Sequence, residues 1–339
     1  MDLYAMTRTA HEIVAPGKGI LAADESTPTM AKRLASIDLE STEGRRRAYR
    51  EILFTAPGIG ELVSGVILYD ETIRQRASDG TPFPEVLRSQ GVIPGIKVDA
   101  GSRPLAGFPD EVVTEGLDGL RARLEEYVGL GARFAKWRAV IRIGADRPTT
   151  TCIESNAHAL ARYAALAQEA GLVPIVEPEV LMDGDHDLDR CTAVTVTTLR
   201  AVYAQLAAHR VVLEATLLKP NMVLPGKDSP AQVGDAEIAE ATVQVMRETV
   251  PAAVPGIVFL SGGQSDEQAT TRLDAINRTG PQPWQLTFSY GRALQASVLR
   301  AWAGQESHRG AAQAALLHRA RMNSAARQGR WTADLERTG

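Results

Sequence analysis

One lysine, Lys219, lies where a buried segment of the chain is expected to end, and its amine could act as a nucleophile. The segment EATLLKPN (214–221) has the apolar composition of a buried parallel strand, and Pro220 cannot donate a ladder hydrogen bond, so the strand should end there. Burial disfavours the charged form of a lysine, and a neutral amine can attack a ketone to form a Schiff base. The alternative is a lysine that merely extends to the surface from a strand end.

The composition of the chain favours a specific role for this lysine. Only six of the 37 basic residues are Lys and the rest are Arg, so the chain uses Arg wherever a general cation suffices. Because Arg stays charged and is a poor nucleophile, it cannot replace a Schiff-base lysine. Lys97, Lys136 and Lys219 all lie in apolar runs, which indicates that these lysines are needed as lysines.

Eight short apolar runs, separated by helical segments, are the elements that must position these residues. The runs are GILAAD (19–24), GVILYD (65–70), IPGIKVD (93–99), FAKWRAV (134–140), VPIVEPEV (173–180), EATLLKPN (214–221), GIVFLSGG (256–263) and LTFSYG (286–291). Helices are expected over 3–14, 156–171, 235–251, 265–278 and 291–302. Asn156 is the expected cap of the second helix, and Ser265 and Gln268 form a capping-box pattern.

Alternating strands and helices in one domain predict an α/β fold, namely a (β/α)8 TIM barrel with extra N- and C-terminal helices. A doubly wound open sheet is the competing architecture, but the glycine-rich phosphate loop that usually follows its first strand is missing after Asp24. No low-complexity linker divides the chain. A single barrel domain over residues 1–339 is therefore expected, with a C-terminal tail from about 325.

Charged and hydroxyl side chains recur near the strand ends, which form one rim in a barrel and carry its active site. Residues two apart in a strand point to the same face, so Glu177 lies with Glu179 and Lys136 with Arg138. Burying such charges is costly unless they pair or a ligand uses them, although a structural ion-pair network is the alternative. The residues at the strand ends are Asp24, Asp70, Lys97, Lys136, Arg138, Glu177, Glu179, Lys219, Ser261 and Ser289.

Two glycine-containing turns after the last two strands suit an anion. Backbone N–H groups at Gly262, Gly263 and Gly291, with Arg292 behind them, could bind a phosphate at a helix N-terminus. The loops after the seventh and eighth strands are the usual phosphate position of a barrel. Two ordinary tight turns are the alternative interpretation.

The bulk properties exclude several classes of protein. The chain has a formal net charge of −4 and no basic tail, so no nucleic-acid partner is expected. Neither a signal peptide nor a membrane-spanning run is present, and Cys152 and Cys191 lack metal-ligand or redox spacing, so a cytoplasmic protein with reduced cysteines is expected. None of the six histidines lies in a strand run, and His186 fits a polar loop better than a metal site. No metal and no cofactor are therefore expected.

Several of these segments resemble those of class I fructose-bisphosphate aldolases, in the family order and over about residues 10–328. The segments are GKGILAADES (17–26), GIKVD (95–99), FAKWR (134–138), PIVEPE (174–179), LLKPNMV (217–223), FLSGGQS (259–265) and LTFSYGRALQAS (286–297). The resemblance implies a (β/α)8 barrel, a phosphorylated ketose as substrate and a homotetramer. A protonated imine would supply the electron sink for cleaving the carbon–carbon bond, so no metal is required.

The resemblance also implies a role for each site residue. Lys219 matches the Schiff-base lysine, Glu177 the glutamate that handles protons as the imine forms, and Asp24 the aspartate near the substrate C4 hydroxyl. Lys136 and Glu179 match their charged neighbours. The C1 phosphate is expected at Ser261, Gly262, Gly291 and Arg292, with Ser289 as a further substrate contact, and the C6 phosphate at Ser26, Thr29, Lys97 and Arg138.

The implied reaction is the reversible cleavage of fructose 1,6-bisphosphate to dihydroxyacetone phosphate and glyceraldehyde 3-phosphate. The same chemistry with a preference for fructose 1-phosphate, or a catalytically silent scaffold of the same fold, stays open. The chain departs from the eukaryotic pattern because no tyrosine follows Tyr290, whereas those enzymes end in a tyrosine associated with proton exchange on the enamine. In this tail Glu336 could donate a proton only if its pKa were raised.

Overall fold

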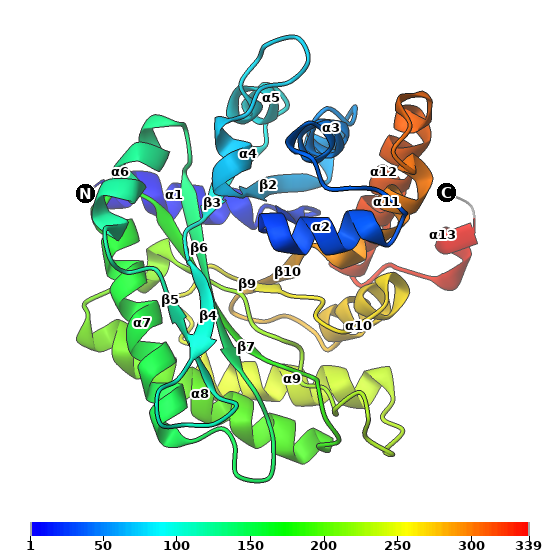
Figure 1. The fold of residues 1–339 in the computed structure, drawn as a ribbon. Coiled ribbons are helices and arrows are strands. Elements are labelled where there is room, and N and C mark those ends of the chain that lie inside the picture. The colour runs from blue at the N-terminus through cyan, green and yellow to red at the C-terminus, as the bar shows by residue number, and fades with distance from the viewer. Residues whose placement is uncertain (1, 338–339) are drawn as a thin grey trace.

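The computed structural model describes residues 2–337, and its centre is a closed barrel of eight parallel strands (Figure 1). The predicted (β/α)8 fold is therefore confirmed, although residues 1, 338 and 339 of the expected domain lie outside the described residues. Around the barrel the strands follow the order β1 (Gly19–Ala23), β10 (Gln285–Tyr290), β9 (Gly256–Phe259), β8 (Leu217–Leu218), β7 (Val173–Val180), β6 (Phe134–Ile141), β3 (Ile93–Lys97) and β2 (Val63–Leu68).

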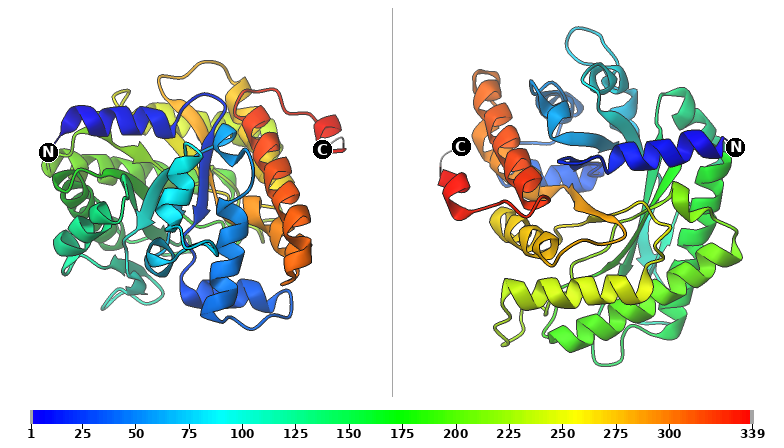
Figure 2. Two further views of the ribbon diagram at one scale, coloured as in Figure 1. Left: turned by 90° about the horizontal axis from the view of Figure 1, so that it is seen from above. Right: turned by 180° about the vertical axis from the view of Figure 1, so that it is seen from behind.

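Helices surround the barrel and cover the outer faces of its strands (Figure 2). They are α2 (Thr27–Ala35), α3 (Glu43–Phe54), α4 (Asp70–Arg74), α5 (Phe83–Ser89), α6 (Leu120–Gly129), α7 (Thr150–Glu169), α8 (Leu188–Ala208), α9 (Asp235–Thr249), α10 (Asp266–Arg278) and α11 (Arg292–Trp302). The predicted extra helices are α1 (Leu3–Ile13) at the start of the chain, and α12 (Arg309–Ala326) and α13 (Ala333–Arg337) at its end. Within residues 2–337 no helix has the length and apolarity needed to cross a membrane.

The inside of the barrel is apolar towards the N-terminal ends of its strands. Met6 and Ile13 of α1 belong to a buried cluster with Phe134 of β6 and with other strand residues, so α1 closes this end. Gly95 makes room for Phe134, because a Cβ at Gly95 would lie 2.3 Å from the Phe134 ring. The polar side chains are thereby left to the opposite end, where the carboxyl ends of the strands meet.

Strand β8 is the shortest of the barrel, with two residues, and it ends directly before Lys219. The 3-10 turn Leu213–Ala215 precedes the strand, and Pro220, which has no backbone N–H to donate, follows Lys219. The ladder of hydrogen bonds therefore cannot continue far in either direction. Lys219 still donates its backbone N–H to the carbonyl oxygen of Val176 at 2.8 Å. This contact holds the lysine backbone against β7, as the prediction of a strand that stops at Pro220 requires.

The expected cap of the second predicted helix is wrong. Helix α7 begins at Thr150, and the Thr149 side chain accepts from the backbone N–H of Cys152 at 3.2 Å. Asn156 is instead buried inside the helix, where it donates to the Val112 carbonyl at 2.8 Å. This bond ties α7 to an antiparallel hairpin, β4 (Gly101–Pro104) and β5 (Val112–Glu115), which the apolar pattern does not predict. The capping box from Ser265 to Gln268 is confirmed at α10.

The two ends of the chain are joined at the barrel. Strand β1 pairs with β2 on one side and with β10 on the other. Beyond α12, the buried Arg327 donates to the carbonyl oxygen of Val14 at 2.9 Å and also to those of Ala15 and Lys18. Burial lowers the pKa of Arg327 to about 10. This guanidinium therefore fastens the segment between α1 and β1 to the end of α12.

Candidate active site

A cavity of about 840 Å³ opens at the carboxyl ends of the strands, and charged side chains line most of it. The structure brings to this cavity every residue to which the family resemblance gave a role. Asp70, which was predicted at a strand end without such a role, lies outside the cavity and accepts a hydrogen bond from the Tyr127 hydroxyl at 2.9 Å. The predicted residues in the lining are Asp24, Ser26, Thr29, Lys97, Lys136, Arg138, Glu177, Glu179, Lys219, Ser261, Gly262, Ser289, Gly291 and Arg292.

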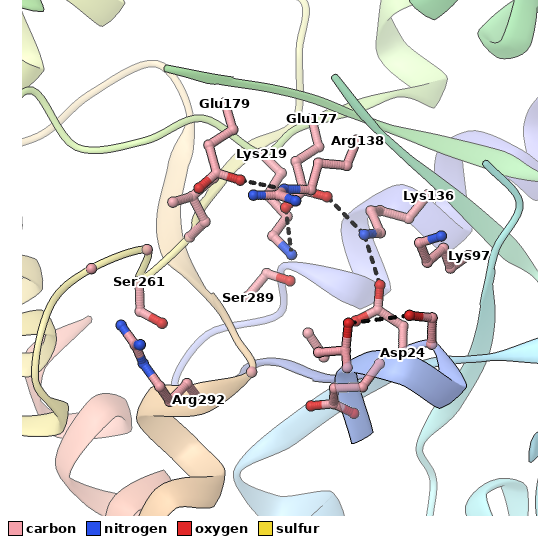
Figure 3. A pocket seen from close by; sticks show the side chains of 18 of the residues that line it. Asp24, Lys97, Lys136, Arg138, Glu177, Glu179, Lys219, Ser261, Ser289 and Arg292 are labelled. Atoms are coloured by element: carbon pink, nitrogen blue, oxygen red, sulfur yellow. Dashed lines mark hydrogen bonds and ion pairs between the residues drawn. The ribbon is translucent and has the colours of Figure 1, made fainter. Parts of the chain in front are cut away.

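At the centre of the cavity, two lysines and two carboxylates form a continuous chain of ion pairs (Figure 3). Lys219 Nζ lies 3.0 Å from Glu177 Oε1, and the other oxygen of Glu177 lies 2.9 Å from Lys136 Nζ. Lys136 Nζ also lies 2.7 Å from Asp24 Oδ2. The four residues come from β6, β7 and the segments that follow β1 and β8, so closure of the barrel is what brings them together.

Burial disfavours the charged forms of these groups, and the ion pairs between them keep the charged forms favoured. Burial alone would raise the pKa of Asp24, but Lys136 and Lys219 hold it well below its usual range. Burial would likewise raise the pKa of Glu177, and the same two lysines lower it. For Lys136, burial acts to lower the pKa, and Asp24 and Glu177 raise it well above the usual value. Both carboxylates and the Lys136 ammonium are therefore charged at neutral pH.

Lys219 differs from Lys136 in having one carboxylate partner instead of two. Its side chain is 5% exposed, and it faces the cavity beside the Ser289 side chain (Figure 3). The Ser289 hydroxyl is buried and has no hydrogen-bond partner among residues 2–337. A buried amine beside a carboxylate that can take up its proton is suited to attack a carbonyl carbon, and an unpartnered hydroxyl is suited to a ligand oxygen.

A second group of charged residues lies towards the cavity mouth. Arg138 Nε donates to Glu179 Oε2, and although burial acts to lower the pKa of Arg138, Glu179 raises it. Lys97 Nζ lies 2.7 Å from Asp99 Oδ1. Charge-assisted pairs of this kind hold two cations in the cavity wall. An anionic ligand in the cavity could bind to both cations while they stay paired with their carboxylates.

The two glycine turns have little room for other residues. Gly263 has a φ of +75°, and a Cβ there would lie 2.0 Å from the Met182 sulfur, while a Cβ at Gly262 would lie 2.7 Å from Glu179 Oε1. Gly291 precedes the first residue of α11, Arg292, whose exposed guanidinium makes no hydrogen bond or ion pair within the described part of the chain. Backbone N–H groups and an unpaired cation at a helix start form a site for an anion.

Several further charged residues of the cavity were not predicted from the sequence. Lys32 and Arg33 lie in its lining, three and four positions after Thr29 on α2. This spacing places them on the same helix face as Thr29, so their position in the cavity could have been predicted from the sequence. Lys227 and Asp183 form an ion pair at the mouth between two loops far apart in sequence, for which no local signal exists.

The C-terminal tail lies away from this cavity, since no residue after Arg292 lines it within residues 2–337. Glu336 of α13 accepts a hydrogen bond from the Trp331 indole at 3.0 Å and pairs with Arg319 at 2.5 Å. Burial alone would raise the pKa of Glu336, but the hydrogen bond from Arg319 lowers it. The raised pKa that a proton donor would need is therefore not found at Glu336.

No cluster of three or more His, Cys, Asp or Glu side chains with the geometry of a metal site occurs in residues 2–337. His186 lies in the loop before α8 and outside the cavity lining. The ion pairs of the cavity join carboxylates to lysine and arginine, which leaves few carboxylate oxygens for a cation.

Comparison with known proteins gives a consistent result. The family model "Fructose-bisphosphate aldolase class-I" matches residues 5–339. A protein of Xanthomonas axonopodis pv. citri named probable fructose-bisphosphate aldolase class 1 is 57% identical over 332 residues, which cover 98% of this chain and 99% of that protein. A fructose-bisphosphate aldolase of Drosophila melanogaster is 59% identical over 326 residues, with 96% and 90% covered.

A solved structure of fructose-bisphosphate aldolase from Plasmodium falciparum, in complex with TRAP and a small-molecule inhibitor, superposes with a TM-score of 0.96. It is 47% identical, and the match covers 97% of this chain and 96% of that one. The fold, the strand-end cavity and these similarities over nearly the full length agree. The chain belongs to the class I fructose-bisphosphate aldolase family.

Proposed function

We propose that this enzyme cleaves fructose 1,6-bisphosphate reversibly to dihydroxyacetone phosphate and glyceraldehyde 3-phosphate through a Schiff base on Lys219. The observation that carries the proposal is the contact of 3.0 Å between Lys219 Nζ and Glu177 Oε1, at the bottom of a cavity with cations in its wall. A buried lysine next to a carboxylate can pass a proton to it and become a nucleophile.

In the proposed reaction Lys219 attacks the C2 carbonyl of the ketose, and Glu177 moves the protons that convert the carbinolamine to an iminium ion with loss of water. Asp24, held ionised by Lys136, accepts the hydrogen bond of the C4 hydroxyl. As this hydroxyl passes its proton to Asp24, the C3–C4 bond breaks and its electrons pass into the iminium, giving an enamine and free glyceraldehyde 3-phosphate. Protonation of the enamine and hydrolysis of the imine then release dihydroxyacetone phosphate.

The two ends of the cavity would bind the two phosphates. The Ser261–Gly262 turn and the start of α11 at Gly291 and Arg292 provide N–H donors and a guanidinium for the C1 phosphate. The C6 phosphate would lie near Lys97 and Arg138, with the hydroxyls of Ser26 and Thr29, which are 3.1 Å apart, as further donors. By the family resemblance we expect a cytoplasmic homotetramer, which light scattering after size exclusion would measure.

The test is to trap the Schiff base with borohydride in the presence of dihydroxyacetone phosphate and to map the modified peptide. One added group on Lys219 is the expected result, and modification of another lysine instead would contradict the proposal. Cleavage of fructose 1,6-bisphosphate and fructose 1-phosphate should be measured in parallel. A faster reaction with fructose 1-phosphate would favour the altered preference, and no turnover of either sugar would favour the catalytically silent scaffold.

A further inference from the structure

Glu25 is a buried carboxylate in the cavity lining that the proposed reaction does not use. Its side chain is 4% exposed and pairs with Arg33 of α2 at 2.5 Å and with Arg50 of α3 at 2.8 Å. Gln295 of α11 donates its amide N–H to Glu25 Oε1 at 2.9 Å. One side chain therefore joins three helices at the edge of the cavity, at the point where the chain passes from β1 to α2.

The two arginines that contact Glu25 are in different surroundings. Arg50 is buried, and its guanidinium also donates to the carbonyl oxygens of Ala23 at 3.0 Å and Glu25 at 3.3 Å. Arg33 is partly exposed and lines the cavity. Two guanidinium groups share one carboxylate, so the cluster carries one positive charge in excess. Because Arg50 is enclosed by protein, that charge faces the cavity through Arg33.

The orientation of Arg33 relates this charge to the glycine turn before α11. Its Nη1 is bound by Glu25, while its Nη2 lies 3.6 Å from the point that a Cβ on Gly291 would occupy. Gln295, one turn after Gly291 on α11, holds Glu25 and also donates to the Ala22 carbonyl at 2.7 Å. The carboxylate thus sets the direction of the guanidinium and the place of the helix start relative to each other.

We propose that Glu25 is a positioning residue that acts through Arg33, holding its guanidinium against the Gly291 turn so that an anion binds there with little reorganisation. The inference rests on the proposed function in taking that anion to be a phosphate of the ketose. Fixing a flexible cation before the ligand arrives lowers the entropy cost of binding. Glu25 itself needs no contact with the ligand, because Arg50 already compensates its charge.

The test is a double-mutant cycle with Glu25→Gln, Arg33→Ala and the double variant. Affinity for inorganic phosphate is measured by calorimetry, and KM and kcat are measured with fructose 1,6-bisphosphate. For Glu25→Gln we expect the Kd of phosphate and the KM each to rise roughly tenfold with kcat within about twofold, as for a weakened charge-assisted contact. In the Arg33→Ala background, Glu25→Gln should change neither constant further. An unchanged or tighter Kd, or additive effects, would overturn the proposal.

Glu51→Gln is the matched control. Glu51 is also 4% exposed and pairs with two arginines, Arg47 at 2.8 Å and Arg309 at 3.8 Å, but it does not line the cavity. This variant should lose thermal stability and keep the affinity for phosphate. An equal loss of affinity in Glu51→Gln would show that any weakened buried pair has this effect, and would refute a specific role for Glu25.

If Glu25→Gln does not fold, Gln295→Met gives a second route. It keeps both ion pairs of Glu25 and removes the amide, which orients the carboxylate and also contacts the Ala22 carbonyl and the Tyr49 hydroxyl. A smaller rise in the Kd of phosphate is expected, absent in the Arg33→Ala background, and no rise at all would count against the proposal. Because phosphate binding needs no turnover, this outcome is independent of the trapping on Lys219, which alone decides the proposed reaction.

Discussion

Replacing Lys136 with methionine tests whether this lysine holds the two carboxylates of the site in place. The change removes the cation that lies 2.7 Å from Asp24 and 2.9 Å from Glu177, and it keeps a side chain of similar length in a position that is 4% exposed. Lys219 then remains as the partner of Glu177, while Asp24 loses its direct ion pair. The variant should therefore be less stable and much less active.

The loss of stability follows from the burial of the network. Removing one partner of a buried ion pair costs about 3–5 kcal/mol, because the other charge stays buried and unpaired. With an unfolding entropy of about 2 cal/mol/K per residue, a chain of 339 residues should show a Tm lower by roughly 4–7 °C. Activity should fall by a factor of about 10² or more, as for the loss of a positioned acid–base pair.

The pH dependence identifies the cause of this loss. In the native protein the pKa of Asp24 is lowered, so its ionised form contributes stability that is complete above its unfolded pKa of about 4 and is lost as the pH falls below it. Without Lys136 the effect of burial on Asp24 is opposed only by Lys219 and Lys97, so the pKa of Asp24 should be higher than in the native protein, and protonation then relieves the buried charge. The stability difference between native protein and variant should therefore shrink below about pH 4.

Thermal unfolding between pH 3 and pH 7 is the assay, with Lys18→Met as the control. Lys18 lies outside this cavity and donates to the Gly60 carbonyl at 2.6 Å. The stability that Lys18→Met loses should therefore not depend on the protonation of Asp24. Adding Asp24→Asn to Lys136→Met should restore about 1–3 kcal/mol of stability, because the unpaired charge is gone, without restoring activity. A stability difference that is the same at pH 3 and pH 7, or no recovery in the double variant, would refute the reasoning.

Four further predictions concern the nucleophile, the phosphate site, metals and the tail. Lys219→Arg should keep the fold and abolish both turnover and borohydride trapping, and substantial cleavage by the purified variant would contradict the Schiff base. Arg292→Ala should raise KM for the bisphosphate far more than for a non-phosphorylated ketose, whereas equal losses would assign Arg292 a structural role. Activity should persist in EDTA, and a loss that Zn²⁺ restores would overturn the imine mechanism. Truncation after Gly329 removes Glu336 from Arg319, so Tm should fall by a few degrees with little change in steady-state cleavage; a selective fall in proton exchange on dihydroxyacetone phosphate would reveal a donor in the tail.

The barrel and the gathering of charged side chains at its strand ends could be predicted from sequence because their signals are local, but the pairing of these charges with one another could not. Each strand is a short apolar run, and the spacing of Glu177 and Glu179 alone places both side chains on one face. The cap of α7 was predicted wrongly because Asn156 serves the hairpin backbone instead of its own helix. The β4–β5 hairpin was missed because its strands have four residues each and are mostly not buried, so they form no apolar run. The cluster around Glu25 could not be predicted, because Gln295 is 270 residues away in the chain and only closure of the barrel brings it near.

The way in which the chain ends meet has a consequence for biosynthesis. Strand β1 is among the first segments to leave the ribosome, but its second neighbour, β10, is among the last. The contact from Arg327 to Ala15 joins residues 312 positions apart, so it can form only after the whole barrel has been translated. For most of elongation the nascent chain therefore carries an open strand edge, of the kind that pairs with other chains. Pairing of β10 with β1 removes this hazard.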